Sequence, residues 1–290
     1  MRRLHFPWVM FAFFAHTGLV LAEDALPTLM STNICADMLA LKLAAPEQIL
    51  SLSKQSHDAQ RFSMAQAAQK YIANTASAED VLMLKPQIVL ASRRWSARQP
   101  MALHQRYGVR MVNIPFPTDW PTILRSTQDI GTAMGRTQQA QQLVAELEHR
   151  LQALRQISRP YKALYLRPNG GSAGVNTHVD AVLEAAGLRN HAGALGLKGW
   201  GTIDLERIVQ NPPDIFITPS IANDTAYARS VLSRHPQMRA LLKHIPVVSL
   251  QHNDWGCSNW LLVEAAEAVA QQVDVLQHAA LVPQRTGAHE

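Results

Sequence analysis

A twelve-residue segment occurs twice in this chain, as EDVLMLKPQIVL at residues 79–90 and as ERIVQNPPDIFI at residues 206–217. The glutamate, the proline and the later apolar positions keep the same spacing at an offset of 127 residues. Each copy predicts a short helix that ends at a proline, followed by a strand apolar enough to be buried. Two copies of this unit predict two related lobes.

The surrounding sequence continues the alternation of strands and helices. Short apolar runs, each followed by a polar loop and a helical pattern, lie at residues 88–91, 109–114, 163–166, 215–218 and 247–250. This alternation is typical of parallel sheets. Helical spacing over residues 120–157 predicts a connector whose second helix, of about 20 residues, spans roughly 30 Å. We therefore expect an α/β fold: two Rossmann-like lobes with parallel sheets, joined by a long helix, with a ligand cleft between them.

The first 22 residues have the layout of a secretory signal peptide. Arg2 and Arg3 precede an apolar run, and Val20 and Ala22 are small residues at the −3 and −1 positions of a cleavage site. We expect a cleaved peptide at 1–22, an N-terminal lobe at 23–120, a helical connector at 121–158, a C-terminal lobe at 159–280 and a flexible tail at 281–290. Export places the protein in the periplasm, where thiols meet an oxidising environment.

The composition excludes several classes of protein. With 47% apolar and 17% charged residues, the chain is not a disordered one, and two cysteines do not make a disulfide-dense scaffold. The net charge of +5 falls to +3 without residues 1–22, and no run of Lys or Arg exceeds two residues. We therefore expect no nucleic-acid partner. Nothing indicates an obligate oligomer, so we expect a monomer.

Loops at the carboxyl ends of parallel strands form the ligand sites of open α/β sheets. The tryptophans near these loops suit a bulky aromatic or macrocyclic ligand, unless each holds its loop to its own lobe. The arginines suit an anionic ligand, or are simply solvated. Trp260 is a fourth tryptophan that we expect near this cleft. The candidate ligand-binding residues are Asn33, Cys35, Arg93, Arg94, Trp95, Asn169, Trp200, His252 and Trp255.

The histidines show no metal-binding motif. His57 and His252 fall near strand-end loops, but isolated histidines of this kind are usually hydrogen-bonded side chains rather than ligands. We expect no metal site built by the protein itself. A ligand that carries its own metal remains compatible with the sequence.

One catalytic pattern is present. Gly170 to Gly174 matches Gly-x-Ser-x-Gly around Ser172, and Asp214 or Asp224 followed by His252 would complete a triad. The next helix is predicted to begin only near residues 177–180, although a nucleophile elbow turns directly into its helix. An exported serine hydrolase that uses Ser172 and His252 is therefore kept only as the alternative. Our main expectation is that the protein is not an enzyme.

Cys35 and Cys257 lie in opposite halves of the chain, each at an expected helix start. Paired, they would tie the two lobes together; free, they would be acidified thiols exposed to oxidation. The sequence leaves both possibilities open, because it does not give the distance between them.

Four segments, taken in order, resemble the periplasmic substrate-binding proteins of ABC importers for iron–siderophore complexes, haem and cobalamin. The segments are STNICADML at residues 31–39, the first repeat at 79–90, Gly199-Trp200-Gly201 with Glu206, and Asn253-Asp254-Trp255. The resemblance spans roughly residues 28–278 and implies a receptor without catalysis and with little hinge closure. It also implies that Glu79 and Glu206 dock onto an inner-membrane ABC permease. The other reading of these glutamates is a favourable charge at a helix N-terminus.

The resemblance also orders the ligands. Cobalamin binders of the family carry aromatics at the positions of Trp95, Trp200 and Trp255, but Asn113 and Pro115 stand where a further aromatic is expected. Haem binders coordinate iron through Tyr or His, for which the two histidines near strand ends are weak candidates. Ferric siderophores need only arginine and aromatic contacts. We therefore expect a ferric siderophore first, then cobalamin, then haem, with no intrinsic cofactor and with Fe or Co carried by the ligand.

Overall fold

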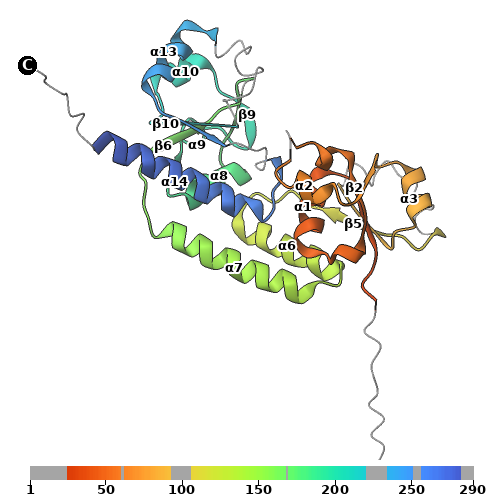
Figure 1. The fold of residues 1–290 in the computed structure, drawn as a ribbon. Coiled ribbons are helices and arrows are strands. Elements are labelled where there is room, and N and C mark those ends of the chain that lie inside the picture. Colours follow the sequence, from red (N-terminus) through yellow and green to blue (C-terminus); the bar gives the residue numbers. More distant parts are fainter. Residues whose placement is uncertain are drawn as a thin grey trace, which may run out of the picture.

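Two parallel sheets, one in each half of the chain, organise the molecule, with long helices between and beneath them (Figure 1). The computed structural model describes residues 25–59, 62–92, 106–167, 169–219, 234–250 and 256–281. We call the first sheet and its helices the N-lobe, and the second sheet and its helices the C-lobe. The predicted residue limits of the lobes stay predictions.

The N-lobe sheet has five parallel strands in the order β3-β2-β1-β4-β5. Their bounds are Leu29–Ser31 (β1), Ile49–Ser53 (β2), Ile72–Asn74 (β3), Ile88–Ser92 (β4) and Arg110–Ile114 (β5). The helices α1 (Ile34–Leu43) and α6 (Trp120–Ala133) pack on one face, and α3 (Ala78–Leu84) packs on the other. The strands read as nearly continuous apolar runs because helices cover both faces. The short α2 (Ala65–Ala68) lies beside α1.

The C-lobe sheet has four parallel strands in the order β11-β10-β6-β8. Their bounds are Lys162–Tyr165 (β6), Arg189–Asn190 (β8), Ile215–Pro219 (β10) and Val247–Leu250 (β11). Alternate side chains bury on opposite faces: Ile215 and Ile217 face α8 and α14, whereas Phe216 packs with α9, α10 and α13. These helices are His178–Ala185 (α8), His191–Ala194 (α9), Leu205–Gln210 (α10), Pro236–His244 (α13) and Leu261–Leu281 (α14). A separate antiparallel pair joins β7 (Gly171–Ala173) to β9 (Trp200–Thr202).

The duplicated segment forms the same structure in both lobes. Helix α3 and strand β4 in the first copy correspond to α10 and β10 in the second. In each pair, the second element begins 127 residues after the first. The strand order β2-β1-β4-β5 is repeated as β8-β6-β10-β11. The five strands predicted from apolar runs are all present, so the two-lobed α/β fold is confirmed.

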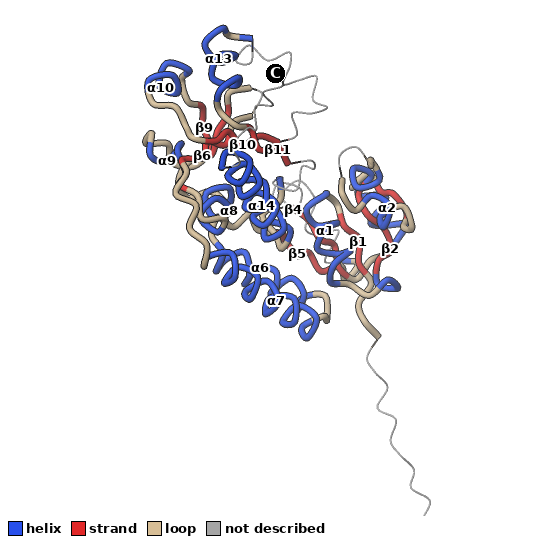
Figure 2. Tube along the Cα trace, turned by 60° about the vertical axis from the view of Figure 1, so that its left-hand side comes forward, coloured by secondary structure: helices blue, strands red, loops and turns tan. Residues whose placement is uncertain are grey.

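Helices α6 and α7 (Thr137–Arg155) form a hairpin along one side of both lobes, and α7 is the long helix of the connector (Figures 1 and 2). The hairpin is tight at its turn, because a Cβ on Gly131 would lie 2.3 Å from the Cβ of Ala140. Only glycine permits this close approach of the two helices.

Helix α14 crosses the molecule and packs on α8, β11 and α7 (Figures 1 and 2). Two arginines clamp it from the connector side. Arg150 binds both carboxylate oxygens of Glu267, at 2.8 and 2.5 Å, and Arg159 binds both of Asp274, at 2.7 Å each. The Arg159 guanidinium lowers the pKa of Asp274. Among the described residues, none of the helices combines the length and apolar character needed to cross a bilayer.

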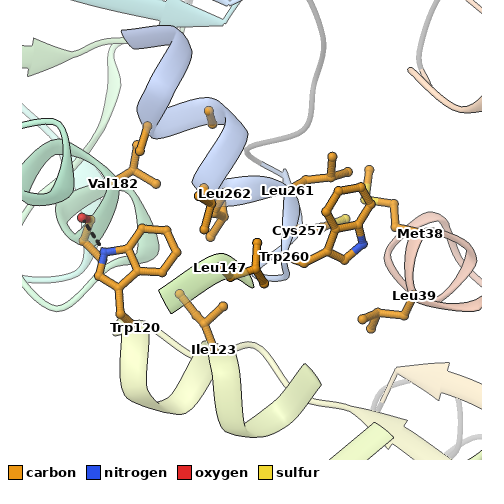
Figure 3. Close-up of a cluster of buried hydrophobic side chains, with 14 of the residues drawn as sticks. Met38, Leu39, Trp120, Ile123, Leu147, Val182, Cys257, Trp260, Leu261 and Leu262 are labelled. Atoms are coloured by element: carbon orange, nitrogen blue, oxygen red, sulfur yellow. Dashed lines mark hydrogen bonds between the residues drawn. The ribbon is translucent and has the colours of Figure 1, made fainter. Parts of the chain in front are cut away.

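One apolar core runs through both lobes and the connector. Figure 3 shows part of it, where side chains of α1, α6, α7, α8 and α14 meet. Trp260 belongs to this core: its side chain is buried, and the ammonium of Lys42 lies 4.6 Å from the centre of its ring. The prediction that Trp260 lies at a ligand cleft is therefore wrong. A loop position before a helix is equally suited to a side chain that closes the core.

Candidate functional site

The two lobes meet at loops that follow the carboxyl ends of their strands. Cys35, in the first turn of α1, forms a disulfide with Cys257, just before α14, with the two Cα atoms 5.3 Å apart. The hydroxyl of Ser258 donates to the carbonyl of Pro117, and the indole of Trp120 donates to the carbonyl of Ala181 at 2.9 Å (Figure 3). The pairing of the cysteines, which the sequence leaves open, is thus made, and it joins the lobes.

A row of rings crosses this junction beside Trp120. Phe116 follows β5 of the N-lobe, and its ring lies edge-on to His178 of the C-lobe, with centroids 5.0 Å apart. His178 in turn lies 5.5 Å from Trp200. Phe116 is 53% exposed and Trp200 is 40% exposed, whereas His178 is buried. The exposed rings therefore form an apolar surface that rests on a buried support.

Arg167 covers one face of Trp200. Its guanidinium carbon lies 4.2 Å from the indole centroid, and its Nε donates to the hydroxyl of Tyr165 at 3.2 Å. Tyr165 is buried and meets Trp200 edge-on at 6.1 Å. We call the five residues Phe116, Tyr165, Arg167, His178 and Trp200 the aromatic ladder. Burial raises the pKa of Tyr165, so this phenol is neutral and does not offset the charge of Arg167.

The backbone around the ladder holds these side chains in place. Trp200 pairs with Ala173 across β7 and β9, and the amide of Arg167 donates to the carbonyl of Gly171 at 2.8 Å. A Cβ on Gly174 would lie 1.9 Å from the carbonyl oxygen of Leu197, so this glycine permits close contact between the two segments. Packing therefore accounts for the second glycine of the Gly-x-Ser-x-Gly pattern.

Ser172 does not occupy a nucleophile elbow. It lies in β7, is fully buried, and donates its hydroxyl to the carbonyl of Tyr165 at 2.6 Å. Thr177 caps the next helix, α8, five residues further along. Asp214 accepts a hydrogen bond from the amide of Lys162, and Asp224 and His252 lie outside the described residues. The serine hydrolase alternative has no support from this geometry.

On the N-lobe side, polar side chains gather at the ends of β1 and β2. Asn33 caps α1 by accepting hydrogen bonds from the amides of Cys35 and Ala36, at 3.1 and 3.2 Å. Asp37 is buried and accepts from the amide of Ser53 at 3.0 Å and from its hydroxyl. Burial raises the pKa of Asp37 to about 6. Both polar side chains stabilise the strand-end loops near the disulfide.

Two of the other candidate ligand residues, Asn169 and His57, are among the described residues, and the rest are not. Asn169 is exposed in the turn beside Arg167 and accepts from the amide of Gly171 at 3.0 Å. His57 has both ring nitrogens at hydrogen-bond distance from carbonyls, those of Ser53 and Tyr71, in line with the expectation that it is not a ligand. The predictions that lie outside the described residues are Arg93, Arg94, Trp95, His252 and Trp255.

Sequence reasoning missed four members of the ladder: Phe116, Tyr165, Arg167 and His178. Two signals were available. Tyr165 and Arg167 lie at the end of the strand predicted over 163–166, and Phe116 lies two residues past the strand predicted over 109–114. At the end of the strand predicted over 109–114, Asn113 and Pro115 stand where the family resemblance implies an aromatic residue. Phe116, the next residue along, contacts the opposite lobe instead.

Glu79 and Glu206 are both exposed in the first turn of their helices, α3 and α10.

Two surface hollows lie on the connector: one of about 480 Å³ between α7 and α14, and one of about 370 Å³ between α6 and α7. Neither hollow is lined by a predicted ligand residue. The described residues contain no cluster of three or more His, Cys, Asp or Glu side chains suited to a metal ion.

Comparisons with known proteins agree with the two-lobed fold. Residues 66–241 match the family model described as periplasmic binding protein. No curated protein sequence matches the chain.

Three solved structures are similar over most of the chain at low sequence identity. The haem-binding protein RhuT of Roseiflexus sp. RS-1 is 19% identical with a TM-score of 0.65, covering 88% of this chain and all of its own. The haem-binding protein HutB of Vibrio cholerae is 16% identical with a TM-score of 0.67, covering 85% and 98%. An ABC-type Fe3+-hydroxamate transport protein of Saccharomonospora viridis is 17% identical with a TM-score of 0.62, covering 87% and 94%.

Proposed function

This chain belongs to the periplasmic binding protein family, and from that premise we propose that it captures a ferric siderophore and delivers it to an ABC permease. Proteins of this family are substrate-binding proteins rather than enzymes. The family also implies a small-molecule ligand, a permease partner and a location in the periplasm or elsewhere outside the cytoplasm. The ligand is the finer question, and the aromatic ladder is the observation that supports our answer.

The ladder suits a large, partly apolar ligand. Phe116 of one lobe and Trp200 of the other expose ring surface at the same junction. An apolar ring edge on each side, with a guanidinium between Tyr165 and Trp200, provides stacking and charge together. A metal chelate with an organic shell presents the complementary surfaces.

The protein groups at the junction favour a ligand that brings all the donors for its metal. His178 and Tyr165 are buried at 1% and 2% exposure, and the ring nitrogens of His57 face carbonyl groups. None of these three side chains, as placed, is open to a haem iron. A siderophore surrounds its Fe3+ by itself, so it needs only the contacts of the ladder, and we propose that no intrinsic cofactor is required.

Haem is the second candidate and cobalamin the third. Haem is favoured by the similar structures of RhuT and HutB, which are described as haem-binding. Cobalamin, whose metal is Co, would use the three tryptophans of the family pattern, of which only Trp200 is among the described residues. This order reverses our expectation from the sequence for these two ligands, because Phe116, Trp200 and Arg167 suit a flat aromatic ligand that carries negative charge.

We propose the same docking role for Glu79 and Glu206 that the family resemblance implies. The two carboxylates occupy equivalent positions in the repeat, one in each lobe, and both are exposed. Reversing both to Lys is expected to reduce uptake of the chelate by cells while leaving its dissociation constant within about twofold. Equal loss of affinity and uptake would contradict the docking role. We further propose that residues 1–22 are a cleaved signal peptide and that the protein is a monomer.

Tryptophan fluorescence titration tests the ligand. We expect micromolar or tighter quenching of the wild-type protein by ferric aerobactin, and weaker binding of hemin and cyanocobalamin. Trp200→Leu is expected to weaken binding about tenfold, since a stacked ring contributes roughly 1 kcal/mol or more. Trp260→Phe, which alters a buried core tryptophan outside the ladder, is the matched control and should leave affinity unchanged. Absence of quenching by all three ligands at 10 µM would refute the proposal.

A further inference from the structure

Arg167 differs from Arg150 and Arg159, the two arginines that clamp helix α14. Arg150 and Arg159 each bind a carboxylate through two nitrogens, those of Glu267 and Asp274. Arg167 makes no ion pair with any described residue. Its nearest polar contact is the neutral phenol of Tyr165, and its charge lies over the ring of Trp200. The guanidinium is therefore held in place, and none of the described residues supplies an anion to balance it.

The geometry also leaves the useful end of the guanidinium available. Arginine has five N–H donors, and here Nε uses its single N–H on Tyr165. Neither terminal nitrogen of Arg167 donates to another described group, so no described residue occupies the two-pronged end that pairs with carboxylates. Asp180, on the same helix as His178, is engaged elsewhere: it accepts hydrogen bonds from the amide of Asn176 and the side chain of Asn190.

Holding a cation in this way restricts its freedom before the ligand arrives. The side chain is half-buried, stacked on Trp200, and fixed at its backbone by the turn from residue 167 to residue 171. A preorganised guanidinium loses little conformational entropy when an anion binds it. Water partly solvates the charge in the free protein, and a ligand anion would replace that water with a charge-assisted hydrogen bond.

We infer that Arg167 makes the binding site selective for chelates that carry a free carboxylate or a similar anionic group. The inference rests on the proposed capture of a metal chelate and specifies the charge of that chelate. The anion would bind the terminal nitrogens of Arg167, while the organic shell of the ligand contacts Trp200 and Phe116. Uncharged chelates would gain only the apolar part of this interaction.

Two pairs of probes separate charge from shape. Ferric aerobactin carries carboxylates, whereas ferrichrome is an uncharged Fe3+ hydroxamate; hemin carries two propionates, whereas its dimethyl ester carries none. Affinities are measured by tryptophan quenching for the siderophores and by Soret absorbance for the haems. For the wild type we expect the acidic member of each pair to bind at least about tenfold more tightly, as expected for one charged hydrogen bond.

Variants of Arg167 then assign the effect to this side chain. Arg167→Met is expected to weaken binding of the acidic probes by about 10- to 100-fold and of the neutral probes by less than threefold. Arg167→Lys should retain part of the preference, because it keeps the charge without the two-pronged geometry. Arg189→Met, an exposed position on β8, is the control and should change no affinity.

The outcomes distinguish this inference from the proposed function. Equal weakening of acidic and neutral probes by Arg167→Met would show that the arginine only supports Trp200, which overturns the inference and leaves the function standing. Absence of binding by all four probes to the wild type would overturn both. A salt series on the wild-type protein needs no variant: affinity for aerobactin should fall between 20 and 500 mM NaCl, and affinity for ferrichrome should not. Equal salt responses would also overturn the inference.

Discussion

The disulfide between Cys35 and Cys257 provides a large and measurable perturbation of this fold. It closes 222 residues of sequence and joins α1 of the N-lobe to the start of α14. Replacing both cysteines by alanine removes the cross-link without placing a hydroxyl in the core, where Cys257 is buried (Figure 3). We expect this double variant to fold and to lose a substantial part of its stability.

The magnitude follows from the length of the closed loop. The chain-entropy model gives about 5 kcal/mol for a cross-link across a separation of 222 residues, and measured values for native disulfides run from about 2 to 5 kcal/mol. The two clamps on α14 and the hydrogen bond from Trp120 remain in the variant, so the lobes stay together in the native state. A loss of 3–5 kcal/mol corresponds to a fall in melting temperature of about 10 °C for a chain of this size.

Thermal unfolding followed by circular dichroism, with and without a phosphine reductant, measures this loss. Reductant should bring the wild-type melting temperature down to that of the Cys35→Ala/Cys257→Ala variant and should leave the variant itself unchanged. The apo protein is used throughout, since ligand binding shifts the melting temperature by mass action. A fall of less than about 2 °C would refute the reasoning, because noncovalent contacts alone would then account for the stability of the junction.

Three further predictions concern buried side chains. Because burial raises the pKa of Asp37 from 3.8 to about 6, the wild type loses stability as pH rises through this interval; Asp37→Asn, measured by urea unfolding, should gain about 2 kcal/mol relative to wild type between pH 4.5 and pH 8, and a pH-independent difference would contradict this. Trp120→Phe leaves the carbonyl of Ala181 without its indole donor and should cost about 1–3 kcal/mol in the same assay, whereas no loss would mean that water replaces the donor. Leu147→Ala, at a fully buried position of α7 (Figure 3), should cost about 2–5 kcal/mol through the cavity that it leaves, and a cost below 1 kcal/mol would show that the helices close over it.

The duplicated segment shows why the secondary structure was predictable. The proline that follows each helix and the apolar residues of each strand act within a dozen positions of sequence, so local rules suffice. β4 and β10 lie where the repeat predicts them, and the other three predicted strands are also present. The strands β1 and β2 were not predicted as such, because they are short and carry serine near their ends.

The aromatic ladder shows where local rules stop. Phe116 and His178 are far apart in sequence and meet only because β5 and α8 belong to lobes that face each other. Arg167 reads as an ordinary loop arginine until Trp200 is placed beneath it by the pairing of β7 and β9. Trp260 shows that a loop position alone does not identify a ligand contact. Its position in the sequence resembles that of Trp200, but its ring is buried in the core.

The sequence by itself determined the class of protein: the repeat, the strand–helix alternation and the order of the loose motifs specify two α/β lobes of a known family. These features can be predicted because hydrophobic periodicity and helix ends are properties of short segments. Only the tertiary structure decided which loop side chains lie at the lobe junction, that Cys35 pairs with Cys257, and that Arg167 lies over an aromatic ring and forms no ion pair within the described part of the chain. Contacts of this kind depend on how whole lobes pack. That packing depends on interactions among many residues that are far apart in sequence, which no short sequence pattern contains.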